Sequence, residues 1–156
     1  NMNSDILNGK VIWITGGNRG IGSAISMKLL ESNPKLIISA TSTDSLSKTV
    51  PLLKNNSNVE LIACNLLNEH EINNTANQII EQFGKIDFLI NNAGVLKFSS
   101  LVKATTEEFD NQIGVNLKGM FLCSRVVLPS MLERNEGAII NINSVSSIKT
   151  TASGSL

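Results

Sequence analysis

The chain has 156 residues, of which 42% are apolar and 17% are charged, with 13 basic and 13 acidic side chains. This composition fits one folded domain of ordinary size and excludes an extensively disordered chain. The balanced charge gives no reason to expect a nucleic-acid or anionic-membrane partner.

The cysteines and the histidine indicate the compartment and exclude a metal site. Cys64 and Cys123 each stand in an apolar run, which predicts buried free thiols and a reducing, cytoplasmic location. The single histidine, His70, stands in a polar stretch, so we expect a solvated residue and no bound metal. The sequence has neither an apolar run of about 18 residues, as a membrane span requires, nor the apolar core of a signal peptide.

Short apolar strands alternate with helices along the chain. The expected strands are 11–15, 35–40, 59–64, 86–90 and 137–144. The expected helices are 21–32, a weak one at 44–55 that contains Pro51, 68–83, and one from 105 or 106 to about 132. Five strands alternating with helices predict an α/β fold, a Rossmann-like, doubly wound parallel sheet with helices on both faces. With no repeat or linker, residues 1–156 are expected to form a single domain.

The segment TGGNRGIG (15–22) joins the first expected strand to the first helix. Its glycines Gly16, Gly20 and Gly22 permit a tight turn and the close approach of a pyrophosphate, while the helix that follows offers free N–H groups to that anion. Many glycine-rich segments are only turns. The position of this one between a buried strand and a helix favours nucleotide binding.

The end of the second strand bears on which nucleotide is bound. NAD-binding domains usually carry an acidic residue there, whereas this strand ends in Ala40, Thr41 and Ser42. Hydroxyl groups do not repel a 2′-phosphate, and Arg19 supplies a cation in the adjacent loop. NADP is therefore favoured over NAD. Arg19 as a plain solvated charge, and Asp44 three residues beyond Thr41, leave NAD open.

Two further polar residues are candidates for the reaction centre. Asn116 shares a helix face with Phe109, Ile113 and Met120, which predicts an amide on an inward, apolar stripe. Such an amide needs a partner, and a structural bond to the carbonyl of a neighbouring strand would suffice. Ser144 ends the fifth strand, where a serine is often only a turn residue.

Four segments together resemble one family. TGGNRGIG, NNAG (91–94), NLKGMF (116–121) and NINSVSS (141–147) occur in the order and spacing of the short-chain dehydrogenase/reductase family, and the resemblance covers the chain from about Lys10 to Ser147. Within that family, KLIISATST (35–43) is most similar to the NADPH-dependent 3-oxoacyl-(acyl-carrier-protein) reductases of fatty acid biosynthesis. Without the other three segments, NNAG would be interpreted as a plain turn.

The resemblance implies a cofactor site in four parts. The pyrophosphate would lie on the loop residues Gly16, Asn18, Arg19, Gly20, Ile21 and Gly22. Thr41 and Arg19 would contact the 2′-phosphate, and Asn65 and Leu66 would flank the adenine. Many relatives carry aspartate at the position of Asn65, which leaves its contact with the adenine amino group open. The ribose and nicotinamide would be lined by Asn92, Ala93 and Gly94.

The resemblance also implies a catalytic serine at Ser144 and, at Asn116, a helix-kinking asparagine that holds a water in a proton relay. The family's proton donor is the tyrosine of a Tyr-x-x-x-Lys motif, and this sequence contains no tyrosine. Family spacing places that motif just after Leu156, so the domain is expected to be incomplete at its C-terminal end. Because positioned acid–base catalysis contributes about 10²–10⁴-fold in rate, the 156 residues alone should be nearly inactive. We also expect them to be marginally stable and aggregation-prone.

The leading hypothesis is an NADPH-dependent reductase of a small-molecule carbonyl, a 3-oxoacyl thioester carried on acyl carrier protein, that forms a homo-oligomer such as a tetramer at full length. One alternative is a family reductase for a sugar, steroid or xenobiotic carbonyl. Another is a non-catalytic dinucleotide-binding protein. A methyltransferase is disfavoured, because its glycine loop is spaced differently and it usually needs an acid ending the second strand.

Overall fold

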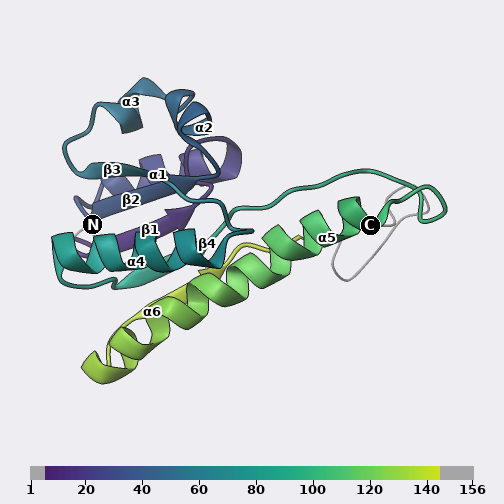
Figure 1. Cartoon of the computed structure of the whole chain (residues 1–156). Helices are drawn as coiled ribbons and strands as arrows, with labels where there is room; N and C mark the ends of the chain where they lie inside the picture. Colours follow the sequence, from purple (N-terminus) through teal and green to yellow (C-terminus); the bar gives the residue numbers. More distant parts are fainter. Residues whose placement is uncertain (1–5, 145–156) are drawn as a thin grey trace.

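The computed structural model describes residues 6–144. In this part of the chain five parallel strands form one sheet in the order β3-β2-β1-β4-β5 (Figure 1). The strands are β1 (Val11–Thr15), β2 (Lys35–Ala40), β3 (Val59–Ala63), β4 (Phe88–Asn91) and β5 (Ala138–Asn141). The helices are α1 (Gly20–Leu30), α2 (Thr43–Ser47), α3 (Pro51–Lys54), α4 (Glu69–Phe83), α5 (Thr106–Ile113), the π-helical turn η1 (Gly114–Gly119) and α6 (Met120–Arg134).

The two faces of the sheet carry separate apolar layers. Val11 and Trp13 of β1 belong to the layer that packs against α4 and α6, while Ile12 and Ile14 belong to the layer that packs against α1 and α3 (Figure 1). Alternate side chains of a strand point to opposite faces, so a fully apolar strand is what a sheet covered on both sides requires. The predicted three-layer, Rossmann-like, doubly wound fold is confirmed.

In the sequence the first helix carries a helical stripe formed by Ile21, Ala24, Ile25, Lys28 and Leu29, but the structure buries a different face. Ile21 is 68% exposed, and the buried residues of α1 are small: Gly22, Ser23 and Ser26. The start of α1 lies close to the glycine loop, where only small side chains fit, and Ser26 Oγ donates to the Gly17 carbonyl at 3.2 Å. The expected stripe is therefore wrong at Ile21, although Ile25 further along packs against the sheet as expected.

The weak helix expected at 44–55 is divided in two. The chain leaves the helical conformation after α2 and re-enters it at Pro51, which occupies the first turn of α3. Proline suits that position because its missing N–H would have no partner inside the helix. The expectation of one helix interrupted by Pro51 is wrong, and the proline begins a helix instead.

The long helix expected up to about residue 132 contains a π-helical turn. It begins with a capping box in which Thr105 Oγ1 accepts from the Glu108 N–H and the Glu108 carboxylate accepts from the Thr105 N–H, both at 3.1 Å. The wider turn η1 then shifts the helix face, and α5 extends beyond the sheet (Figure 1). The expected inward stripe is wrong already on α5, where Phe109 and Ile113 are 48% and 42% exposed.

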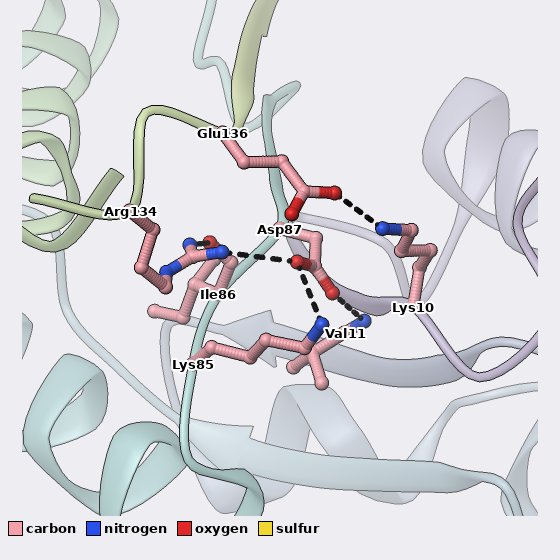
Figure 2. Close-up of polar contacts among 7 residues, drawn as sticks. All are labelled: Lys10, Val11, Lys85, Ile86, Asp87, Arg134 and Glu136. Atoms are coloured by element: carbon pink, nitrogen blue, oxygen red, sulfur yellow. Dashed lines mark hydrogen bonds and ion pairs between the residues drawn. The ribbon is translucent and has the colours of Figure 1, made fainter. Parts of the chain in front are cut away.

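A cluster of charged side chains joins elements at the amino ends of β1 and β4 (Figure 2). Asp87, whose side chain is 2% exposed, accepts from the Val11 N–H at 2.9 Å and forms ion pairs with Lys85 at 3.1 Å and Arg134 at 3.3 Å. Burial alone raises the pKa of the Asp87 carboxyl, but these donors outweigh it and hold the pKa below its ordinary value. Asp87 therefore links β1 and β4 to the end of α6.

Candidate functional site

The order of the strands reverses at β1, which has β2 on one side and β4 on the other. In open α/β sheets ligands bind at the carboxyl ends of the strands at such a reversal. A crevice of about 470 Å³ opens there. It is lined by every residue predicted to bind the cofactor: Gly16, Asn18, Arg19, Gly20, Ile21, Gly22, Thr41, Asn65, Leu66, Asn92, Ala93 and Gly94.

The glycine loop requires glycine at the three positions that the motif predicts, for reasons of backbone conformation or of space. Gly16 and Gly20 have φ values of 65° and 55°, the left-handed region that favours glycine. A Cβ on Gly22 would lie 2.2 Å from the Gly16 carbonyl oxygen and 2.5 Å from Asn92 Nδ2. Helix α1 begins at Gly20, and the residues of its first turn line the crevice. The free N–H groups of this turn are therefore suited to binding a diphosphate.

The carboxyl ends of β1 and β4 are joined by side chains of the two motifs. Thr15 Oγ1 accepts from the N–H groups of Asn92 and Ala93, both at 3.1 Å. Asn92 Nδ2 donates to the carbonyls of Thr15 and Gly16, both at 3.0 Å. NNAG is therefore more than a plain turn, because its second asparagine holds the glycine loop in place.

Among residues 6–144, no carboxylate lines the crevice at the expected 2′-phosphate position. Thr41 and Arg19 are both exposed and both line the crevice. Asp44, which left NAD open in the sequence, lies in the first turn of α2 and pairs with Lys48 at 2.9 Å. Asp44 is not among the lining residues.

The expected adenine wall is formed by the loop after β3. Asn65 Oδ1 accepts from the Leu67 N–H at 3.1 Å, and the Asn65 N–H donates to the Glu71 carboxylate at 2.8 Å. Glu71, which we did not predict, also accepts from Asn68 Nδ2 at 3.0 Å. The pattern of an asparagine N-cap with glutamate three residues later was the available signal for it. The Asn65 carboxamide oxygen is thus already engaged within its own loop.

Asn116 pairs with a loop and not with a strand. Its Nδ2 donates to the Val95 carbonyl and its Oδ1 accepts from the Val95 N–H, both at 2.8 Å. The residue is exposed, so the expectation of a buried amide is wrong, and the carbonyl that it bonds belongs to the loop after β4 and not to a neighbouring strand as expected. Ser144 is exposed and lies three residues beyond β5, so the expectation that it ends this strand is wrong. Neither residue lines the crevice, and their catalytic roles stay predictions. Residues 145–147 of the NINSVSS segment lie outside the described residues.

A buried polar chain next to this site was missed. Asn91, which is 4% exposed, donates from Nδ2 to Ser124 Oγ at 3.1 Å and to Asn141 Oδ1 at 2.9 Å. Ser124 in turn donates to the Met120 carbonyl at 2.8 Å. These bonds connect the ends of β4 and β5 to α6. The available signal in the sequence was an asparagine at the end of each of these two strands, Asn91 and Asn141.

The two cysteines are free thiols and both are buried, as predicted. Burial raises the pKa of each thiol, most strongly for Cys123. His70 lies exposed on α4, also as predicted.

Among residues 6–144, no group of three or more histidine, cysteine, aspartate or glutamate side chains could hold a metal ion. In that same part of the chain, no helix is long and apolar enough to cross a membrane.

A doubly wound sheet with a glycine loop and a crevice at the β1–β4 reversal defines a dinucleotide-binding protein of the Rossmann class. The chain belongs to the short-chain dehydrogenase family, whose family model matches residues 10–156. It is therefore an oxidoreductase-family chain.

Known relatives agree with this assignment. The chain is 36% identical over 139 residues to the 3-oxoacyl-(acyl-carrier-protein) reductase of Staphylococcus epidermidis, covering 87% of this chain and 57% of that protein. It is 31% identical over 151 residues to an uncharacterized oxidoreductase of Staphylococcus aureus, covering 97% and 65%. A metagenomic short-chain oxidoreductase solved in complex with NADP superimposes with a TM-score of 0.86 at 33% identity, covering 95% and 67%. The chain thus spans roughly three-fifths of the length of such relatives.

Proposed function

We propose that the full-length protein is an NADPH-dependent reductase that converts a carbonyl to an alcohol, with a 3-oxoacyl thioester as its substrate. The observation that carries the proposal is the crevice itself, where the glycine loop, Thr41, the loop after β3 and NNAG meet at the strand reversal. The 3-oxoacyl-(acyl-carrier-protein) reductases among the relatives support the substrate class.

The preference for NADP is supported by the wall that holds Thr41 and Arg19. The guanidinium of Arg19 can form charge-assisted bonds to a phosphate, and the hydroxyl of Thr41 adds a neutral donor. Asp44, in the first turn of α2, is paired with Lys48 and does not line the crevice. Solved neighbours with NADP bound support the same cofactor.

The bound nicotinamide ring supplies the hydride. Residues of the full-length protein must then hold the carbonyl oxygen and provide the proton. In this proposal the Ser144 hydroxyl donates a hydrogen bond to that oxygen, and Asn116 supports a proton relay. Since the 156 residues include no tyrosine, the proton donor in this proposal lies in the part of the relatives' length that this chain does not cover.

A homo-oligomer and a cytoplasmic location are part of the proposal. Four apolar side chains four residues apart run along α5, η1 and α6 and are 42–60% exposed: Phe109, Ile113, Leu117 and Phe121. Exposed apolar rows of this kind support a protein interface. Two buried free thiols fit a reducing compartment. Light scattering of the full-length protein should give a mass larger than one chain, and a monomer would contradict this part.

The reductase proposal is tested by steady-state kinetics of the full-length gene product. Acetoacetyl thioesters should be reduced with NADPH, with kcat/KM at least about tenfold above that with NADH. A panel of sugar, steroid and simple ketone substrates is assayed in parallel. Faster reduction of one of these would contradict the thioester. Nucleotide binding without turnover of any carbonyl would leave a binding protein.

A further inference from the structure

We propose that Asn18 is a positioning residue that links the glycine loop to α2 and thereby sets the preference for a 2′-phosphorylated dinucleotide. The inference rests on the proposed NADPH-binding function and assigns a distinct role to one side chain. The resemblance to the family implies only that Asn18 belongs to the loop on which the pyrophosphate lies.

The Asn18 carboxamide is used inside the protein. The residue is 3% exposed, and its Nδ2 donates to the Ser45 carbonyl at 2.9 Å and to Ser45 Oγ at 3.2 Å. A buried amide that lost these acceptors would be left without compensation for its desolvation. The Nδ2 group of Asn18 therefore bonds to α2, and the hydrogen-bond donor that Asn18 has left for a pyrophosphate is its backbone N–H.

Helix α2 is short and buries little of its own surface against the sheet. It has five residues, fewer than an isolated helix needs for stability, and Leu46 is its one buried residue. Its N-cap bond, from the Ser45 N–H to Ser42 Oγ at 3.2 Å, is internal. Thr41 directly precedes this cap, and both Thr41 and Ser45 line the crevice. The link from Asn18 thus ties the α2 side of the 2′-phosphate wall to the glycine loop.

The pyrophosphate side of the crevice is held by different bonds. The Gly16 N–H donates to the Ser39 carbonyl at 2.7 Å, Asn92 Nδ2 donates to the Gly16 carbonyl at 3.0 Å, and Ser26 Oγ donates to the Gly17 carbonyl at 3.2 Å. None of these bonds uses the Asn18 side chain. Loss of the Asn18 carboxamide should therefore release α2 and leave the glycine turn in place.

This separation predicts a selective effect on binding. If Asn18 positions α2, its removal weakens ligands that carry a 2′-phosphate and spares those that lack it. If Asn18 instead acts on the pyrophosphate, all dinucleotides should weaken alike, because they share that group. The ratio of the two affinities distinguishes the roles.

The test is a titration of full-length wild type and Asn18→Ala with NADPH, NADH, 2′-phospho-ADP-ribose and ADP-ribose. For the two 2′-phosphorylated ligands the Kd should rise about 5- to 30-fold, the loss expected for one or two buried hydrogen bonds. For the two others it should change by less than about twofold. Ser47→Ala, on the exposed side of α2, removes a hydroxyl that bonds only within the helix and should change none of the four.

Hydrogen exchange without any nucleotide gives an independent readout. In Asn18→Ala the amides of 43–47 should exchange faster, while those of α1 should keep the wild-type rate. Asn18→Ser, which shortens the side chain but keeps a polar group there, serves as the second variant and should show the same selectivity.

Wild-type binding of NADPH with an unchanged ratio in Asn18→Ala, or with equal weakening of all four ligands, would overturn this proposal alone. Wild-type protein that bound no dinucleotide would overturn the proposed function, and this inference with it.

Discussion

The Asn116 side chain and the Val95 backbone form a closed pair of hydrogen bonds, each 2.8 Å long. Val95 directly follows NNAG and lines the crevice, whereas Asn116 lies in the π-helical turn η1. The pair therefore fixes one wall of the crevice to the helix that passes beside it.

Asn116→Ala should lower the free energy of unfolding by about 1–3 kcal/mol, since it removes two hydrogen bonds. Chemical denaturation of the full-length protein measures this change. Lys118→Ala, an exposed change in the same turn, is the control and should have no effect. In the proposed relay role, kcat should also fall while the Kd for NADPH stays within about twofold. Unaltered stability would contradict the structural part of this account.

Gly22→Ala should destabilise the fold and abolish dinucleotide binding together. The added methyl group would lie 2.2 Å from the Gly16 carbonyl oxygen, so the loop or α1 must move, at a cost of about 1–3 kcal/mol. In the matched change Gly94→Ala, the new Cβ would meet Asn116 Oδ1 at 3.5 Å, an ordinary contact, and stability should stay near wild type. Thermal melts with and without NADPH measure both effects. Equal melting temperatures for the two variants would be inconsistent with the packing described for Gly22.

Asp87→Asn should lower stability by about 1–3 kcal/mol at neutral pH, because it weakens the contacts with Lys85, Arg134 and the Val11 N–H. The pKa of Asp87 is held below its ordinary value of 3.8, so its carboxylate stabilises the fold above that pH. This contribution is lost as the pH falls through the folded-state pKa.

The difference in unfolding free energy between wild type and Asp87→Asn should accordingly be constant from about pH 8 to pH 5 and shrink below about pH 4. Denaturation curves at several pH values give this difference. Asp110→Asn, an exposed change on α5, is the control. A difference that stayed constant down to pH 3 would rule out a lowered pKa as its source.

Cys64 and Cys123 should react with a thiol reagent at least about 100-fold more slowly in the folded protein than in urea, because both are buried and burial raises the pKa of both. Cys64 lines the crevice, so NADPH should slow its labelling further and leave Cys123 unaffected. Mass spectrometry of labelled peptides distinguishes the two sites. Rapid labelling of Cys123 in the native state would mean that α6 packs differently.

The strands and the glycine loop were predictable because their signals are local. An uninterrupted apolar run bounded by glycines leaves few alternatives to a buried strand, and a glycine-rich turn between strand and helix leaves few alternatives to an anion site. The crevice then follows from the topology. All the predicted cofactor residues line it because parallel strands bring their carboxyl ends to one edge.

The misses arise where distant parts of the chain meet. The π-helical turn begins and ends at Gly114 and Gly119, where an added Cβ would lie 2.5 Å from Leu67 and 2.9 Å from Leu66. The helix thus passes very close to the loop after β3, which helical periodicity cannot reveal. The Asp87 cluster likewise draws two of its partners, Val11 and Arg134, from segments that are distant in the sequence.

The most direct test of the central claim is calorimetric titration of the full-length protein with NADPH and with NADH. The account predicts a saturable signal with NADPH and a Kd at least about tenfold weaker for NADH. A protein that is folded by circular dichroism but releases no heat with either nucleotide would contradict the assignment of the crevice at the β1–β4 reversal.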